Sequence, residues 1–153
     1  MSHIQRLKER LLSLHDGGFQ DAVYLNPWLS PAVVSLLLDH GRQVHPRAVR
    51  FVGGEWMQCH KNALELATRC PDLVPWFGLG VYREVGATEF LWWIHSWVVD
   101  REGVLHDSSV PPDAPPMYWG IPWGRELYQV IPKRADAVEV TELPLVLTRS
   151  IFL

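Results

Sequence analysis

Three residues whose types cooperate in nucleophilic catalysis follow one another along the chain as Cys59, His95 and Asp107. The cysteine comes after the glycine turn Gly53-Gly54 and before an apolar-periodic run, so we expect it in the first turn of a helix. Free backbone N–H groups and the helix dipole favour an anion there, and the thiolate is the nucleophilic form. A cysteine nucleophile needs a nearby base, which in turn needs an orienting acceptor. The sequence therefore predicts a thiol site with His95 as the base and Asp107 as its orienter.

The pairing of His95 with Asp107 depends on the turn that joins their strands. Successive side chains of a strand point to opposite faces, so the register decides which of them meet. A turn with an odd number of residues, or a bulge, places Asp107 on the face of His95 and Trp97. A two-residue loop turns Asp107 away and pairs Ser108 with His95. The sequence leaves both registers open.

Further residues near the cysteine are candidates for binding the substrate. Gln58 could offer a side-chain donor to an oxyanion together with the Cys59 backbone N–H, or be an ordinary polar residue at a helix start. The indoles of Trp56, Trp97 and Trp119 are candidate walls of a substrate groove. Core packing accounts for each of them equally well.

Two more histidines lie beside the predicted triad. His60 points about 100° around the helix from Cys59, so we expect it at the surface or on a cleft rim. His106 alternates with Asp107 and is expected to face solvent, while Asp100 is expected to serve the turn. A metal site from Cys59 and the histidines is an alternative, but a sequential Cys-His pair is poor geometry for one ion. No metal or cofactor is predicted.

Composition limits the class of protein. A chain of 153 residues suits one domain, 1–153, and its 48% hydrophobic content can form a real core. The net charge of −3 gives no reason to expect nucleic acid as a partner, and no apolar run is long enough to cross a bilayer. The N-terminus has no signal-peptide core, so we expect a cytoplasmic protein, with specialised export left open. Cys59 and Cys70 lie three helical turns apart, roughly 16 Å, which predicts free thiols.

The periodicity of apolar residues predicts helices first and strands after them. Helices are expected over residues 2–14, 31–40 and 58–68, and strands over 49–52, 76–85, 90–100 and from 104 onward, with further strands over 126–131 and 137–147. Residues 19–26, 42–50 and 108–122 are expected to be a connector, a polar link and a proline-rich excursion. The predicted class is α+β, with an antiparallel meander after the helices.

The run from His95 to Ser109 resembles the His-Ala-Trp … Gly … Asp-Pro-Thr segment of transglutaminase-like proteins, which have a papain-like fold. In that superfamily a cysteine at a helix N-terminus precedes a histidine strand and an aspartate strand. The resemblance covers 53–109 and implies that Cys59 is the nucleophile, His95 the base and Asp107 its orienter. It also implies a papain-like fold in which the nucleophile helix packs on an antiparallel sheet. Here the cysteine is followed by histidine instead of tryptophan or alanine, and Asp107 by two serines.

The predicted function is that of a cysteine hydrolase or acyltransferase that acts on an amide or ester bond through a thioester. Water as acceptor would give a peptidase, amidase or deamidase, and an amine would give a transferase. The expected substrate is a peptide, a protein or a small amide, and the oligomeric state is left undetermined. Two alternatives remain at this level: a papain-like binding or structural module without turnover, and an effector-type glutamine deamidase.

Overall fold

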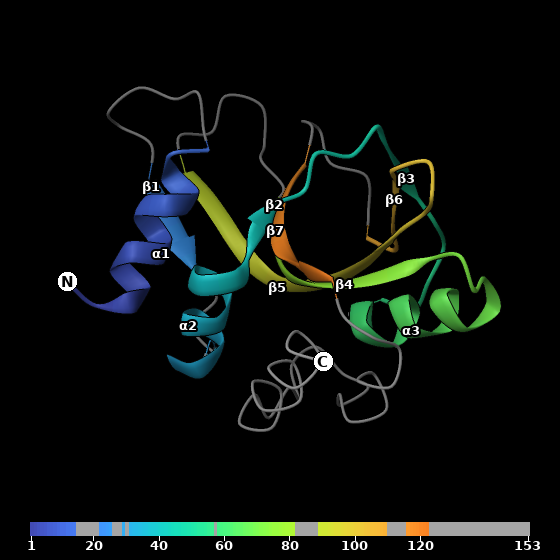
Figure 1. Ribbon diagram of the computed structural model, residues 1–153, viewed down its shortest axis with the longest axis horizontal. Helices are drawn as coiled ribbons and strands as arrows, with labels where there is room; N and C mark the ends of the chain where they lie inside the picture. The colour runs from blue at the N-terminus through green and yellow to red at the C-terminus, as the bar shows by residue number, and fades with distance from the viewer. Residues whose placement is uncertain are drawn as a thin grey trace.

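The structure of the protein is a computed structural model (Figure 1). The residues that it describes form helices and a mixed sheet, and they are residues 1–14, 22–25, 29, 31–56, 58–81, 89–109 and 116–122. Within these residues three helices, mostly N-terminal, pack on a seven-stranded sheet that is largely antiparallel. The α+β class predicted from the sequence is confirmed.

The three helices lie close to the ranges that apolar spacing predicted. Helix α1 spans His3–Leu12, and the Ser2 hydroxyl at its N-cap accepts the Gln5 N–H at 3.3 Å. Helix α2 spans Pro31–His40 and begins with proline, which fits the first turn because its missing N–H would have no partner there. Helix α3 spans Cys59–Arg69.

The sheet has the strand order β2-β7-β4-β5-β6-β3, and β1 pairs with β5 outside this path. The strands are β1 Ala22–Leu25, β2 Arg42–Gln43, β3 Ala48–Phe51, β4 Val74–Val81, β5 Glu89–Val99, β6 Val104–Asp107 and β7 Met117–Pro122. The antiparallel meander β4-β5-β6 is confirmed. The predicted antiparallel sheet is confirmed only in part, because β1 runs parallel to β5 and β3 runs parallel to β6.

Several segments predicted to be irregular contain strands. Residues 22–25 of the expected connector form β1, the expected polar link contains β2 and most of β3, and 117–122 of the expected excursion form β7. The prolines of β7 stand at its borders: Pro116 precedes it and Pro122 is its last residue, so its apolar middle still pairs with β4. The strands predicted over 126–131 and 137–147, and the turn over 86–88, lie outside the described residues.

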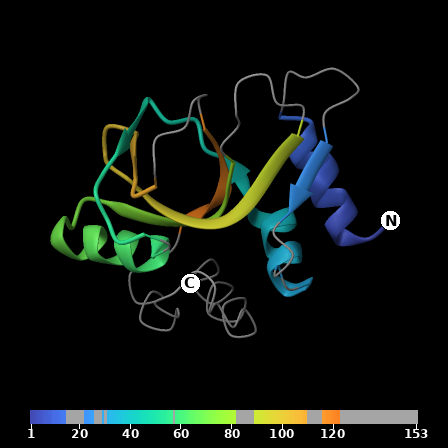
Figure 2. The same cartoon turned by 180° about the vertical axis from the view of Figure 1, so that it is seen from behind.

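The two faces of the sheet carry separate apolar clusters. The larger cluster joins side chains of all three helices to alternate residues of the central strands, among them Phe77, Leu79, Trp92, Val98 and Ile121. Figures 1 and 2 show α2 and α3 on the same side of the central strands β4 and β5, while the sheet curves so that its strands β6 and β3 rise on the opposite side. The smaller cluster consists of Trp76, Trp97, Leu105 and Tyr118. Because strand residues alternate in direction, His95 belongs to the face of this smaller cluster.

Candidate active site

Cys59 is the first residue of α3, as the sequence predicted. The chain leaves β3 with the Val52 N–H bonded to the Asp107 carbonyl oxygen at 2.7 Å, so the start of the loop is joined to the end of β6. The loop then tightens where the Gln58 N–H donates to the Glu55 carbonyl oxygen at 3.2 Å. Cys59 is 8% exposed, and its position gives the thiol the unpaired N–H groups and the positive end of the helix dipole.

Asn62 binds both the loop between β3 and α3, which we call the nucleophile loop, and the segment after β6. Its Oδ1 accepts the Glu55 N–H at 3.1 Å, and its Nδ2 donates to the Glu55 carbonyl oxygen at 2.9 Å and to Ser108 Oγ at 3.1 Å. Gly54 passes so close that a Cβ there would lie 2.6 Å from Asn62 Nδ2 and 3.0 Å from Ser108 Cβ. The loop, the helix start and the end of β6 are therefore held as one unit. Asn62 was not predicted as a site residue. The available signal was a polar residue in the first turn of the helix, on the face that carries the apolar residues.

The turn between β5 and β6 resolves the register that the sequence left open. Val98 pairs with His106 and Val99 with Leu105, and the Asp100 N–H donates to the Val104 carbonyl oxygen at 2.9 Å. Residues 101–103 thus form a three-residue loop that ends at Gly103 with φ of 79°, the left-handed conformation that such loops require.

An odd loop places Asp107 on the same face as His95, so the first of the two predicted registers is the one present. The Asp100 carboxylate stabilises this loop. Its Oδ1 accepts the N–H groups of Glu102 at 3.0 Å and Val104 at 2.9 Å, which confirms the predicted turn role of Asp100.

Asp107 is fully buried, and its carboxylate accepts hydrogen bonds from His95, Ser109 and Tyr118. His95 Nε2 lies 2.8 Å and the Ser109 N–H 2.9 Å from its Oδ1, and the Tyr118 hydroxyl donates to its Oδ2 at 2.7 Å. The Ser109 hydroxyl also lies 3.2 Å from His95 Nε2. A buried carboxylate is costly unless its oxygens are paired, and here both oxygens have donors. Ser109 and Tyr118 were not among the predicted site residues, because nothing in local spacing ties them to Asp107.

His95 lies between this carboxylate and the Cys59 thiol. Burial alone would lower the pKa of His95, but the charge and hydrogen bond of Asp107, with smaller contributions from Cys59, raise it to about 10. The imidazole therefore holds its proton at neutral pH. Because Nε2 is bonded to Asp107, Nδ1 is the ring nitrogen that is left for the thiol.

The electrostatics of Cys59 complement those of His95. Burial alone would raise the pKa of the Cys59 thiol, but the neighbouring imidazoles of His60 and His95 outweigh it, and the pKa lies well below its usual value. His60 Nε2 is buried without a hydrogen-bond partner in the described part of the chain. The pKa of the thiol therefore depends on both imidazoles, and His95 is the one that also pairs with Asp107. The lowered pKa of Cys59 and the raised pKa of His95 both favour a thiolate–imidazolium pair.

The other predicted site residues have different positions. Gln58 precedes α3, is partly buried and makes no side-chain capping bond, while Trp56 is 82% exposed on the nucleophile loop. Trp97 is 1% exposed, with its ring centroid 6.0 Å from that of His95 and 5.0 Å from that of Tyr118. Its indole therefore supports the His95 ring from within the smaller cluster. Contact of Gln58, Trp56 or Trp97 with a substrate stays a prediction.

His60 and His106, the two histidines beside the triad, are held by polar partners. The prediction that His60 lies at the surface is wrong: it is 1% exposed, because the first turn of α3 packs on the sheet and His60 faces β5. His106 is partly buried and bonds through Nε2 to Asp100 Oδ2 at 2.9 Å. Among the residues that the structure describes, no group of three or more His, Cys, Asp or Glu side chains is placed to hold a metal ion.

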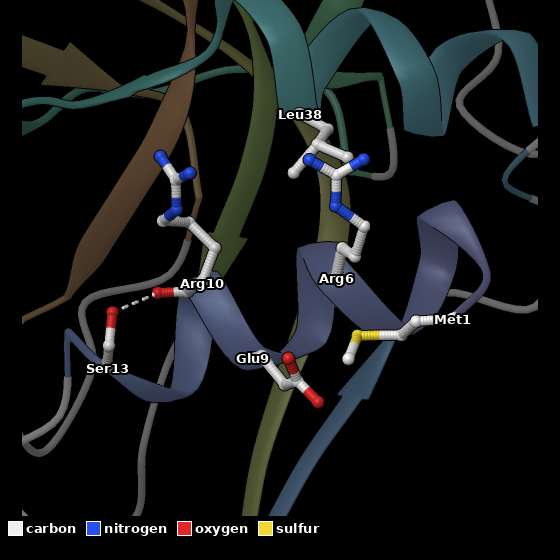
Figure 3. Close-up of a pocket in the computed structure, with 6 residues that line it drawn as sticks. All are labelled: Met1, Arg6, Glu9, Arg10, Ser13 and Leu38. Carbon is white, nitrogen blue, oxygen red and sulfur yellow. Dashed lines mark hydrogen bonds between the residues drawn. The ribbon is translucent and has the colours of Figure 1, made fainter.

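A separate hollow of about 430 Å³ lies beside α1 and the end of α2. Arg6 and Arg10 extend into it from the same side of α1 (Figure 3), and the Arg10 guanidinium lies 5.9 Å from the ring centroid of Trp119. Trp119 itself is 5% exposed and donates its indole N–H to the Leu37 carbonyl oxygen at 2.9 Å. Trp119 thus belongs to the helix-side core, and none of the triad residues lines this hollow.

Comparisons with protein-family models, with curated proteins and with solved structures found no match to this chain. Within the described residues, no helix has the length and apolar character needed to span a membrane. The function is therefore inferred from the geometry of the site.

Proposed function

We propose that this protein is a cysteine hydrolase or acyltransferase that attacks an amide or ester bond with Cys59 and forms a thioester intermediate. The observation that carries the proposal is the buried His95–Asp107 pair, joined at 2.8 Å beside a thiol at a helix start. A histidine that was only structural would not need a fully buried carboxylate with two further donors to keep it charged. The peptide, protein or small-amide substrate, and the cytoplasmic location, are part of the same proposal.

Acylation begins from the thiolate. The Cys59 sulfur attacks the carbonyl carbon and a C–S bond forms, while the carbonyl electrons move onto the oxygen. The Cys59 backbone N–H and the Gln58 side chain are the proposed donors to this oxyanion at the start of α3. When the intermediate collapses, the C–N or C–O bond breaks and His95 Nδ1 gives its proton to the leaving amine or alcohol.

Deacylation reverses these roles. Neutral His95 accepts a proton from water or from an acceptor amine, whose oxygen or nitrogen attacks the thioester carbon. The C–S bond breaks, the acid or new amide leaves, and the thiolate–imidazolium pair is restored. Asp107 stays ionised throughout and holds the ring with Nδ1 toward the sulfur. Hydrolysis is the form that we propose first, and glutamine deamidation is the same reaction with ammonia as the leaving group.

We also propose that the domain has the papain-like, transglutaminase-like arrangement. The order of a cysteine helix, a histidine strand and an aspartate strand supports it, since α3 precedes β5 and β5 precedes β6, with β4 between α3 and β5. The direct contact between the residues on β5 and β6 supports it further. A papain-like scaffold without turnover is the competing outcome, and it predicts a thiol that forms no acyl adduct.

Trapping the acyl-enzyme tests the proposal. The full chain is mixed with a small activated ester such as p-nitrophenyl acetate, and intact-mass spectrometry with peptide mapping locates the acetyl group. We expect a burst of nitrophenol and acetylation of Cys59, both lost in Cys59→Ala and retained in Cys70→Ala, since Cys70 is exposed at the far end of α3. Acetylation confined to Cys70, or a burst retained by Cys59→Ala, would reject the proposed function. Adding a primary amine then separates transfer from hydrolysis by its product.

A further inference from the structure

A second pair of side chains joins α3 to β5 directly beside the triad. His60 follows Cys59 on the helix and Ser96 follows His95 on the strand, and His60 Nδ1 lies 2.5 Å from Ser96 Oγ. Adjacent residues of the helix thus interact with adjacent residues of the strand. Because His95 and Ser96 point to opposite faces of the sheet, the start of α3 is held from both sides of β5.

The environment of His60 is closed. His60 and Ser96 are each 1% exposed, and the His60 ring centroid lies 5.8 Å from that of Phe77 on β4. His60 Nε2 is buried and has no hydrogen-bond partner among the described residues. An aromatic residue without nitrogen would fill this place with no unpaired polar atom. What the histidine adds is the bond to Ser96 and a polar ring beside the thiol.

We propose that His60 and Ser96 are positioning residues, which fix the first turn of α3 on β5 and so keep the Cys59 sulfur against His95. This inference rests on the proposed function, because it assigns the two residues to the thiolate of that same site. Asn62 holds the preceding loop from the other direction through Glu55 and Ser108. The nucleophile is therefore fixed by one polar contact to the strand and by another to the loop.

Electrostatics support the same assignment. Although burial opposes it, the charge of His60 helps to lower the pKa of the Cys59 thiol, together with His95. The titratable groups that act on the sulfur are thus His60 from α3 and His95 from β5, with Asp107 of β6 behind His95. Loss of the His60–Ser96 bond should release the start of α3 and weaken the effects of both His60 and His95 on the pKa of the Cys59 thiol.

The test measures the pH dependence of Cys59 alkylation by iodoacetamide in the full chain, with Cys70→Ser as background. His60→Phe removes the bond and keeps a ring, Ser96→Ala removes the hydroxyl, and Ser96→Thr retains it. Val98→Ala is the matched control, since Val98 is fully buried on the Ser96 face of β5 and makes no bond to α3 through its side chain. His60→Gln replaces His60→Phe if that variant does not fold.

We expect His60→Phe and Ser96→Ala to shift the midpoint of thiolate formation upward by about one pH unit, with about tenfold slower labelling on the acid side. Ser96→Thr should have the wild-type midpoint of thiolate formation. Val98→Ala should lower the melting temperature but leave that midpoint unchanged. Profiles of His60→Phe and Ser96→Ala that superimpose on a flat wild-type profile would overturn this inference and leave the proposed function intact. A wild-type profile like that of a free thiol would overturn both.

Discussion

Replacing Asp107 with asparagine removes the charge that keeps His95 protonated while preserving the shape of the side chain. The Asp107 carboxylate accepts hydrogen bonds from His95, Ser109 and Tyr118 at distances of 2.7 to 2.9 Å. An amide must place its NH₂ group against either the His95 and Ser109 donors or the Tyr118 hydroxyl. Because the Tyr118 hydroxyl can accept as well as donate, the amide can take the second arrangement. The variant therefore loses the ion pair, and charge-assisted hydrogen bonds become weaker bonds to a neutral group at a fully buried position.

The magnitude follows from the pKa of His95, which burial would lower but which Asp107 raises to about 10. An ordinary histidine has a pKa near 6.5, so the carboxylate and its neighbours favour the imidazolium by roughly three orders of magnitude. Breaking one partner of a buried pair costs about 3–5 kcal/mol. Because the folded pKa lies above the unfolded one, this stabilisation is fully present below about pH 6.5 and is lost as pH rises through about 10.

Urea unfolding of the wild type and of Asp107→Asn measures the difference in their free energies of unfolding at two pH values, one near 6 and one above about 10. We expect a loss of about 3–5 kcal/mol near pH 6 that shrinks to about 1–2 kcal/mol above pH 10, where only hydrogen bonds differ. Tyr118→Phe is the matched control, since it removes one donor and leaves the charge. An Asp107→Asn penalty that is equal at both pH values, or that equals the Tyr118→Phe penalty, would refute the reasoning.

Two further substitutions test how the site is held. In Gly80→Ala the new Cβ lies 3.3 Å from His95 Cδ2, so the imidazole ring should tilt and alkylation of Cys59 should slow about tenfold. Gly53→Ala is the control, because a Cβ there has nothing within 4 Å and Cys59 should alkylate at the normal rate. Equal alkylation rates in the two variants would argue against contact between the new Cβ and the ring. Asn62→Ala removes three hydrogen bonds and should lower the free energy of unfolding by about 1–3 kcal/mol, measured in urea, and slow alkylation as well. Lost stability with unchanged alkylation would show that Asn62 does not position the thiol.

The helices and the central meander could be predicted because their signals are local. Apolar spacing, and Pro31 at a helix start, are contained within a few residues. The three-residue loop before β6 was beyond the sequence, since its length depends on which backbone groups pair across the hairpin. The loop length decides whether Asp107 lies on the same face as His95. The Cys59, His95 and Asp107 motif could therefore be recognised in the sequence, but the contact between His95 and Asp107 could not be predicted from it.

The errors have a common physical cause, which is tertiary contact. Met117–Pro122 reads as a proline-rich excursion, yet it pairs with β4 on one side and β2 on the other. His60 reads as a surface residue, yet the packing of α3 on β5 buries it against Ser96. The remaining partners of the site, such as Tyr118 on Asp107, come from segments far apart in the chain, and spacing cannot reveal them.

The most direct test of the thiolate–imidazolium pair is the alkylation rate of Cys59 in Cys70→Ser as a function of pH. An ordinary thiol gains thiolate about 75-fold between pH values of about 6 and 8. Because the pKa of Cys59 is well below its usual value and His95 keeps its proton to about pH 10, the rate should change by less than about twofold over that range. His95→Ala should restore the steep dependence. A wild-type rate that climbs like that of a free thiol would contradict the account.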